Sequence, residues 1–381
     1  MKKVLITGAR GFLGRNLTAH LKTMNDVELL LYDIENNEEE LGRWLALADV
    51  VFHLAGINRP RNVKEYETGN AGFTKNVCKI LRQLGRKPKI IMSSSIQAEQ
   101  DNPYGKSKRR AEESLKALSR ETGTPVSIYR LKNVFGKWCR PNYNSVTATF
   151  CHNIASDLPI TISDPRREIE LVYIDDVVAR FVEEMSESST AKNGLVSNTI
   201  SSTRITLGEM AGRIQAFHEM KRHITIPDFS HRFNQQLYAT YLSYVSPDAL
   251  EHGLEIKADS RGNLAEFIKS RHLGQIFVSR TRPGITRGNH YHHTKTEKFL
   301  VLTGHGLIRM RHIESDDVVE YRVYGEDYHV IDIPPGYTHS ITNVGEDEMV
   351  TLFWASEIFN PDRPDTYYMD VDRIDHVAGR R

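Results

Sequence analysis

The sequence has few cysteines, almost no net charge and no long apolar run. Its 381 residues include three cysteines, too few and too scattered for a disulfide framework or a zinc finger. The 50 basic and 49 acidic side chains leave a formal net charge of +1, which encodes no general attraction to nucleic acid or to an anionic membrane. No apolar segment approaches membrane-spanning length, and the start MKKVLITG lacks the long apolar region of a signal peptide. We therefore expect a cytoplasmic protein that binds neither nucleic acid nor membrane.

Strand-like and helix-like segments alternate over the first half of the chain. Apolar runs of strand length lie at residues 2–8, 27–33, 49–56, 87–95 and 125–131, with helix-like segments between them. This alternation is typical of parallel strands joined by crossover helices, so it predicts a doubly wound α/β domain of the Rossmann type. A mostly helical stretch follows, from about Ile205 to Asp248.

The pattern changes after residue 250. From Ile256 onward, short alternating strands are separated by turn signals such as RPGITRGN, TGHG, PPGY and NVGED. Short strands at this spacing predict an antiparallel sandwich or barrel. We therefore expect two domains, at residues 1–250 and 251–381.

The stretch TGARGFLG, residues 7–14, places three glycines between the first strand and the first helix. A nucleotide pyrophosphate needs close approach of backbone here, and a helix N-terminus favours its charge. Gly8, Gly11 and Gly14, with Phe12 and Leu13 between them, therefore predict a dinucleotide site.

The choice between NAD and NADP stays open in the sequence. Asp33 ends the second strand, where a carboxylate accepts ribose hydroxyls and repels a 2′-phosphate, which favours NAD. Arg10, inside the glycine turn, could instead pair with a 2′-phosphate.

Tyr104 and Lys108 are four residues apart in YGKSK and would share one face of a helix. A nearby ammonium favours the phenolate, so we expect a lowered Tyr104 pKa and proton exchange with a carbonyl or alcohol. Ser95, at the end of the preceding strand, could hydrogen-bond the same oxygen.

In combination, TGARGFLG, DVVFHLAG, SSS and YGKSK resemble the extended short-chain dehydrogenase/reductase family over about residues 1–245. The resemblance implies that Ser95, Tyr104 and Lys108 form a catalytic triad, and that most such enzymes act on nucleotide sugars. It also implies that the cofactor site includes Tyr104, Lys108, Leu54, Ala55, Gly56 and Asn70.

A sugar 4,6-dehydratase would need an acid and a base directly after the serine. Ile96 and Gln97 stand there and cannot perform that step, so a reductase or a 4-epimerase remains. The segment YRLKNVFGKWCRPNYNS combines lysine and arginine side chains with an aromatic ring and asparagine amides. Such a mixture suits the binding of a diphosphate-linked sugar. The candidate substrate-binding residues there are Arg130, Asn133, Lys137, Arg140 and Asn142.

A second cluster lies in GNHYHHTKTEKF. On a strand, His290 and His292 share one face while His293 points to the other. Glu297 follows a short polar turn, and PPGYTHSITN presents His339. Both stretches resemble the two cupin motifs. Three imidazoles and one carboxylate suit zinc, iron, manganese or nickel, and the ligand types alone do not choose among them. Zinc is the expected ion.

The joined pattern resembles, over nearly the whole chain, the bifunctional capsular or O-antigen enzymes that make UDP-N-acetyl-L-fucosamine precursors. The resemblance implies that the cupin domain epimerises C3 of a UDP-2-acetamido-2,6-dideoxy-4-hexulose. The reductase domain then reduces C4 with NADPH or NADH, giving UDP-2-acetamido-2,6-dideoxy-L-talose. Those reductases use NADPH and carry a basic residue after the second strand, where this chain has Asp33 and Ile34. The choice between NADPH and NADH therefore stays open. We expect a homodimer.

Two alternatives remain. The chain could be a UDP-sugar 4-epimerase or reductase whose cupin is only a metal-stabilised dimerisation or binding module. It could also be a sugar-binding or regulatory protein on a reductase scaffold, although the intact triad disfavours this.

Overall fold

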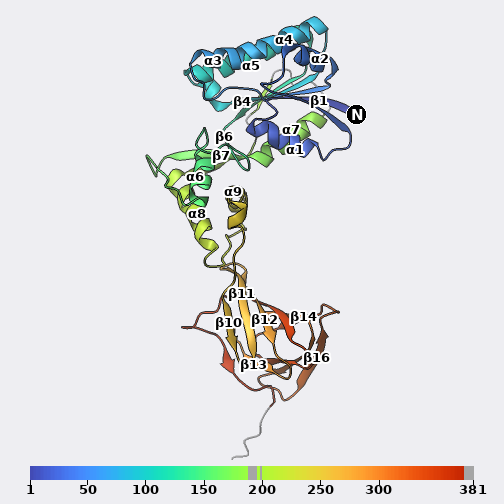
Figure 1. The fold of residues 1–381 in the computed structure, drawn as a ribbon, viewed down its shortest axis with the longest axis vertical. Helices are drawn as coiled ribbons and strands as arrows, with labels where there is room; N and C mark the ends of the chain where they lie inside the picture. The colour runs from blue at the N-terminus through green and yellow to red at the C-terminus, as the bar shows by residue number, and fades with distance from the viewer. Residues whose placement is uncertain (188–194, 198–199, 373–381) are drawn as a thin grey trace, which may run out of the picture. The chain divides into compact units, whose positions relative to one another are not determined.

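The computed structural model describes residues 1–187, 195–197 and 200–372, and its contacts divide the chain into two compact units (Figure 1). The first unit comprises Met1–Gln215 and Gln235–Ser246. The second comprises Ala216–Asn234 and Pro247–Arg381.

The first unit is built on a six-stranded sheet with the order β2-β1-β3-β4-β5-β8, in which all neighbours are parallel. The strands are β1 (Lys2–Thr7), β2 (Val27–Tyr32), β3 (Val50–His53), β4 (Lys89–Ser95), β5 (Val126–Leu131) and β8 (Leu195–Ser197). The doubly wound α/β fold expected from the sequence is confirmed, with the five strand-like runs forming β1 to β5.

Helices cover both faces of this sheet (Figure 1). Apolar residues of α1 and α7 form one buried cluster with the sheet, and those of α2, α4 and α5 form another on the opposite face. The helices that flank the sheet are α1 (Phe12–Leu21), α2 (Glu38–Leu47), α3 (Lys64–Tyr66), α4 (Phe73–Leu84), α5 (Pro103–Thr122) and α7 (Ile174–Ser186).

A smaller part of the first unit follows β5. Its three-stranded sheet has the order β6-β7-β9, with strands β6 (Asn133–Phe135), β7 (Glu168–Tyr173) and β9 (Thr203–Thr206). The helices beyond β5, apart from α7, are α6 (Val146–Ala155), α8 (Leu207–Met220) and α9 (Arg232–Leu242). The last residues of α8, from Ala216, and the first of α9, up to Asn234, belong to the second unit.

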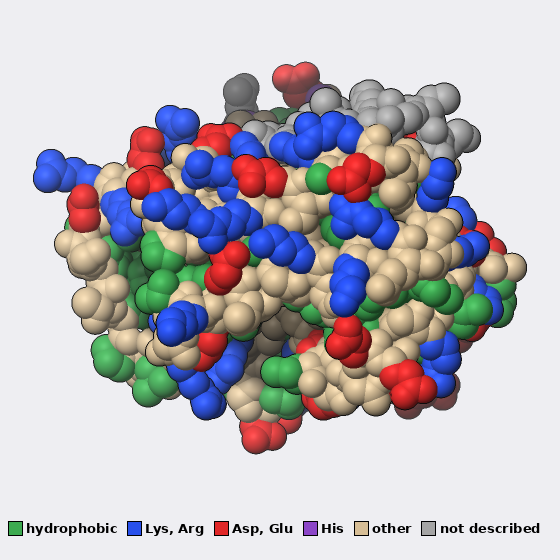
Figure 2. All heavy atoms as spheres, turned by 90° about the horizontal axis from the view of Figure 1, so that it is seen from above, with side chains coloured by type: hydrophobic (Ala, Val, Ile, Leu, Met, Phe, Trp, Pro, Cys, Tyr) green, Lys and Arg blue, Asp and Glu red, His purple; other side chains and the backbone are tan. Residues whose placement is uncertain are grey.

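The outer surface over α4 and α5 is charged. Figure 2, which views the molecule from this side, shows lysine and arginine side chains in a band across the face with acidic side chains among them. Charges of both signs, interspersed in this way, are typical of a solvated helix surface.

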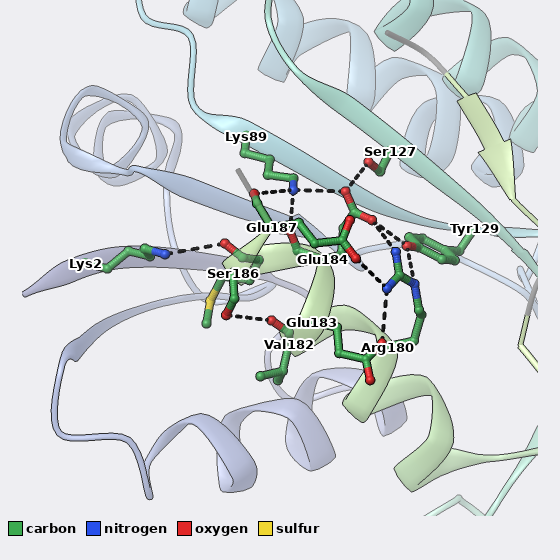
Figure 3. A network of polar contacts seen from close by, with 11 residues as sticks. Lys2, Lys89, Ser127, Tyr129, Arg180, Val182, Glu183, Glu184, Ser186 and Glu187 are labelled. Atoms are coloured by element: carbon green, nitrogen blue, oxygen red, sulfur yellow. Dashed lines mark hydrogen bonds and ion pairs between the residues drawn. The ribbon is translucent and has the colours of Figure 1, made fainter. Parts of the chain in front are cut away.

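A buried carboxylate ties α7 to the sheet (Figure 3). Glu184 accepts hydrogen bonds from Ser127 Oγ at 2.7 Å, from the Tyr129 hydroxyl at 2.8 Å and from Arg180 Nη2 at 2.8 Å. Lys89 Nζ lies 2.9 Å from the same carboxylate. Lys89 begins β4 and Ser127 lies near the start of β5, so this network fixes the C-terminal end of α7 at the amino ends of the strands.

The second unit packs two antiparallel sheets face to face. One has the order β10-β11-β12-β19-β14-β17 and the other β16-β15-β18-β13-β20. Phe299, Ile308, Met310, Ile341 and Phe353 belong to the buried apolar cluster of this unit.

The strands of the second unit are β10 (Ile256–Asp259), β11 (Gly262–Ser270), β12 (Gly274–Thr281), β13 (Thr286–Tyr291), β14 (Glu297–Thr303), β15 (His305–His312), β16 (Val318–Tyr324), β17 (Val330–Ile333), β18 (Tyr337–Asn343), β19 (Met349–Ala355) and β20 (Tyr367–Tyr368). The expected all-β domain is confirmed. One 3₁₀ turn, Pro247–Ala249, precedes it.

Candidate active site and metal centre

The glycine turn connects β1 to α1 by close backbone packing. Gly8 has φ of 71°, and a Cβ added to it would lie 2.8 Å from Ala55 Cα. A Cβ on Gly14 would lie 2.1 Å from the Gly8 carbonyl oxygen. The start of α1 has no side-chain cap and no acidic residue in its first turn. The turn therefore has the close backbone approach and the bare helix start that a pyrophosphate site needs.

A carboxylate closes the outer end of this turn. Asp33 accepts a hydrogen bond from Arg10 N at 2.6 Å and another from Ile34 N at 2.8 Å. The Arg10 guanidinium forms an ion pair with Glu35. Two carboxylates thus follow β2, and the one cation of the turn is already paired with one of them.

A cavity of about 820 Å³ begins at the glycine turn and extends past the end of β4. The candidate residues that line it are Gly8, Arg10, Gly11, Phe12, Leu13, Gly14, Leu54, Gly56, Ser95, Tyr104, Lys108, Asn133 and Arg140. Cofactor, catalytic and substrate candidates therefore meet in one space, as parallel strands that end at the same edge require.

Lys108 is held one helical turn below Tyr104. Asn102 caps α5 by accepting a hydrogen bond from Gly105 N, and Pro103 begins the helix. Lys108 is 5% exposed, and its Nζ donates to the Ser93 carbonyl at 2.8 Å. Burial lowers the pKa of Lys108 to about 8, against the opposing charge of Glu112.

The expectation of a lowered Tyr104 pKa is wrong for the protein alone. Burial raises the pKa of Tyr104, and a hydrogen bond with Ser95 opposes this only in part. The reason is that the Lys108 ammonium is directed to the Ser93 carbonyl, so desolvation of the phenol dominates. Tyr104 is therefore protonated at neutral pH.

Several candidates do not line the cavity. Asn70 donates to the Ile57 carbonyl and to Ser107 Oγ and accepts from Ile57 N, so it fixes neighbouring backbone. Lys137 pairs with Asp175 at 2.6 Å. Asp33, Ala55 and Asn142 also lie outside the lining.

Arg130 is turned to the protein interior instead of to the cavity. Its Nε and Nη2 donate to the two oxygens of Glu112 at 2.9 and 2.7 Å, and Nη1 donates to Glu99. Glu112 is 1% exposed and also accepts from Ser94 Oγ at 2.6 Å. Sequence reasoning missed Glu112, although its position four residues after Lys108 could have indicated it.

The second cluster assembles from three strands. His290 on β13 pairs across the ladder with His339 on β18, His292 directly follows β13, and Glu297 begins β14. One ligand atom from each of these four residues lies within 4.8 Å of the others. His293 contacts the rings of Tyr291 and Tyr367 instead. The shared face expected for His290 and His292 is confirmed.

The donor set fits a divalent metal ion. The Nε2 atoms of His292 and His339 are buried, and Oε2 of Glu297 in the same cluster lies 3.4 and 3.2 Å from them. Their Nδ1 atoms face carbonyl oxygens, that of Asp365 at 2.5 Å and that of Tyr337 at 3.1 Å. This arrangement leaves the Nε2 lone pairs directed at the cluster, as metal-ligating histidines require. Burial, and then His339, lower the pKa of His290 to about 4, so its ring is neutral.

The segment before β20 supports this cluster. The Asp365 carboxylate accepts from the backbone N–H groups of His293, Thr294 and Lys295, each at 3.0 Å. It therefore fixes the turn between His292 and Glu297, while the Asp365 carbonyl orients His292.

In the part of the chain that the structure describes, no helix combines the length and apolar character needed to cross a membrane.

Comparison with protein families matches both units. Residues 4–198 match the NAD dependent epimerase/dehydratase family, and residues 257–367 match the polysaccharide biosynthesis C-terminal domain.

Relatives match nearly the full length. The chain is 43% identical over 374 residues to a UDP-2-acetamido-2,6-beta-L-arabino-hexul-4-ose reductase of Pseudomonas aeruginosa, covering 97% of this chain and 99% of that protein. It is similar to the crystal structure of the capsular polysaccharide assembling protein CapF of Staphylococcus aureus, with a TM-score of 0.89 and 45% identity over 97% of this chain and 100% of that one.

A more distant likeness concerns the fold alone. A UDP-glucuronic acid 4-epimerase of Bacillus cereus in complex with NAD has a TM-score of 0.55 and 19% identity, covering 64% of this chain and 98% of that one. The chain belongs to the NAD dependent epimerase/dehydratase family.

Proposed function

We propose that the chain is an NAD(P)H-dependent reductase of a UDP-linked 4-ketosugar in polysaccharide biosynthesis. The observation that carries this proposal is that Ser95, Tyr104 and Lys108 line one cavity with the glycine turn. The full-length likeness to a hexul-4-ose reductase supports it. Asn133 and Arg140, which line the same cavity, are the candidate contacts to the sugar nucleotide.

In this proposal a bound nicotinamide cofactor supplies the hydride that reduces C4. Tyr104 donates its phenolic proton to the C4 oxygen, and its raised pKa keeps that proton in place until the reaction. Ser95 Oγ orients the carbonyl. Lys108, with a pKa of about 8, is mostly cationic at neutral pH and can hold ribose hydroxyls and stabilise the phenolate that forms.

We further propose that residues 251–381 epimerise C3 of UDP-2-acetamido-2,6-dideoxy-4-hexulose before residues 1–250 reduce it. The product is UDP-2-acetamido-2,6-dideoxy-L-talose, a precursor of UDP-N-acetyl-L-fucosamine. His290, His292, Glu297 and His339 would hold a divalent ion, zinc as the expected one. When bound, that ion would polarise the C4 carbonyl and so acidify the C3 proton. A homodimer stays part of the proposal.

Separating the two activities tests the proposal. Tyr104→Phe should abolish NAD(P)H oxidation with the UDP-4-ketosugar, while solvent deuterium still enters the sugar at C3. His290→Ala should abolish the deuterium exchange and leave reduction of a C3-inverted ketosugar. His305→Ala, which alters an exposed histidine of the same unit, is the matched control.

Each outcome bears on a different part of the proposal. No NAD(P)H oxidation by the wild type with any UDP-4-ketosugar would refute the reductase. Exchange that persists in His290→Ala would assign the second unit to metal-stabilised assembly or binding without chemistry.

A further inference from the structure

The metal cluster lies in a cavity of about 480 Å³. Four cationic side chains that do not belong to the cluster also line this cavity. The charged residues that line it are Lys257, Arg261, Arg287, Lys295, Glu266 and Glu297. Glu297 belongs to the metal cluster. Glu266 is already paired with Lys257 at 3.1 Å and with Lys269 at 2.9 Å. The remaining wall is therefore positively charged.

A β-bulge brings Arg287 to the side of the metal ligands. Simple alternation along β13 would turn Arg287 and His290 to opposite faces, since they are three residues apart. The ladder with β18 shifts register between Gly288 and His290, where Gly288 has φ of 102° and Asn289 has φ of 57°. The extra residue restores the phase, so both side chains line the same cavity.

Arg287 lacks an acidic partner. Its Nε donates to Thr281 Oγ1 at 3.0 Å and its Nη2 to the Arg280 carbonyl at 3.4 Å, both neutral acceptors. Among the described residues, no carboxylate forms an ion pair with it. Burial lowers the pKa of Arg287, and the positive charge of Arg261 lowers it further. Asp259, whose charge acts on Arg287, is already bound by Arg261 through two side-chain bonds and one backbone bond.

Lys295 adds a second cation, and none of the described carboxylates forms an ion pair with it. It is 5% exposed, its Nζ donates to the Pro364 carbonyl at 2.9 Å, and it lies 5.9 Å from the centre of the Phe359 ring. A buried ammonium with only neutral partners loses its hydration without an opposing charge. In the described part of the chain, the half-buried Arg287 and the buried Lys295 are thus two cations without a carboxylate partner that line one cavity.

We propose that Arg287, with Arg261 and Lys295, binds the diphosphate of the nucleotide sugar in this second cavity, so that the chain carries two separate diphosphate sites. This inference rests on the proposed function, which requires the same ketosugar to enter the second unit. A guanidinium fork matches two phosphate oxygens at once, and two phosphate charges would offset the two unpaired cations. Because Arg287 and His290 lie on one strand, a diphosphate on Arg287 leaves the hexose ring near the metal ligands.

Calorimetric titration of the metal-loaded full chain with UDP tests the assignment. We expect two UDP molecules per chain for the wild type and one for Arg287→Gln, or a second site at least tenfold weaker. Uridine, which lacks the diphosphate, should not occupy the second site. Arg280→Gln is the matched control because the Arg280 side chain, on β12, is 59% exposed and does not line the cavity.

Unchanged UDP stoichiometry and affinity in Arg287→Gln would overturn the assignment. A second site that survives Arg287→Gln but disappears in His290→Ala would also overturn it, because the diphosphate would then sit on the metal. If Arg287→Gln does not fold, Arg261→Gln, with its side chain 53% exposed, replaces it. Two UDP sites in a wild type that shows no C3 exchange would support the diphosphate site while refuting the epimerase.

Discussion

Replacing Glu112 by glutamine should weaken the first unit and shift the pH dependence of reduction. Glu112 is 1% exposed and accepts three hydrogen bonds, two from Arg130 and one from Ser94. A glutamine retains one acceptor oxygen and directs an amide N–H₂ at a guanidinium nitrogen. Breaking a buried ion pair on one side costs about 3–5 kcal/mol. Arg130 keeps Glu99 as a partner, so we expect about 3 kcal/mol.

A loss of about 3 kcal/mol corresponds to a fall in Tm of roughly 6–12 °C for a unit of this size. Differential scanning calorimetry of the full chain measures it. Glu113→Gln is the matched control because Glu113 is the next residue on α5 and is exposed.

The effect on pH follows from Lys108, which faces Glu112, Tyr104 and the buried, neutral His53. Burial lowers the pKa of Lys108 to about 8, and Glu112 opposes that shift. The proposed role needs the ammonium, so activity is present below this pKa and lost as the pH rises through it. Without the Glu112 charge, the pKa of Lys108 falls further, and the alkaline limb of kcat/KM should move to lower pH. A folded Glu112→Gln variant with an unmoved limb, or with a Tm within 2 °C of the Glu113→Gln control, would refute this reasoning.

Three further outcomes can be measured directly. Because Asp33 and Glu35 both follow β2, a 2′-phosphate meets two carboxylates, and we expect KM for NADPH to exceed that for NADH at least ~10-fold, about 1.4 kcal/mol; equal values in steady-state kinetics would contradict this. Glu184→Gln should lower the Tm because three hydrogen-bond donors and Lys89 lose the carboxylate that they contact. In the wild type, calorimetry should show the same stability being lost as the pH falls from about 4.5 toward the Glu184 pKa of about 2. Asp365→Ala should weaken zinc binding roughly 10–100-fold in competition with a chelator, since it frees the turn beside His292, and an unchanged affinity would show that the turn holds without it.

The metal cluster shows how far residue spacing alone can lead. The period of two along a strand predicts that His290 and His292 share a face, and the structure brings both to Glu297 and His339. The same rule fails three residues earlier. The rule places Arg287 on the face opposite His290, but the bulge at Gly288 and Asn289 changes the phase of the strand and brings both to one face. Such a bulge depends on pairing with a strand that is distant in the sequence.

The first unit shows a different limit. The glycine turn and the Tyr104–Lys108 spacing are local, so the sequence places them correctly in one cavity. Arg130 was expected to meet the substrate because it stands in a basic segment after a strand. Its direction is decided instead by the buried Glu112, eighteen residues earlier, and only the fold brings the two together. The pKa of Tyr104 depends on burial in the same way.

The link between His292 and Asp365 has a consequence for how the protein is made. The carbonyl that orients the His292 ring lies 73 residues further along the chain. At a synthesis rate of about 5–20 residues per second, the ribosome adds that carbonyl roughly 4–15 s after the histidine. During this interval the first unit can already be folded while the His292 imidazole lacks the carbonyl that orients it. In the proposed function, stable capture of a metal ion would therefore belong to the last stage of biogenesis, after the first unit already exists.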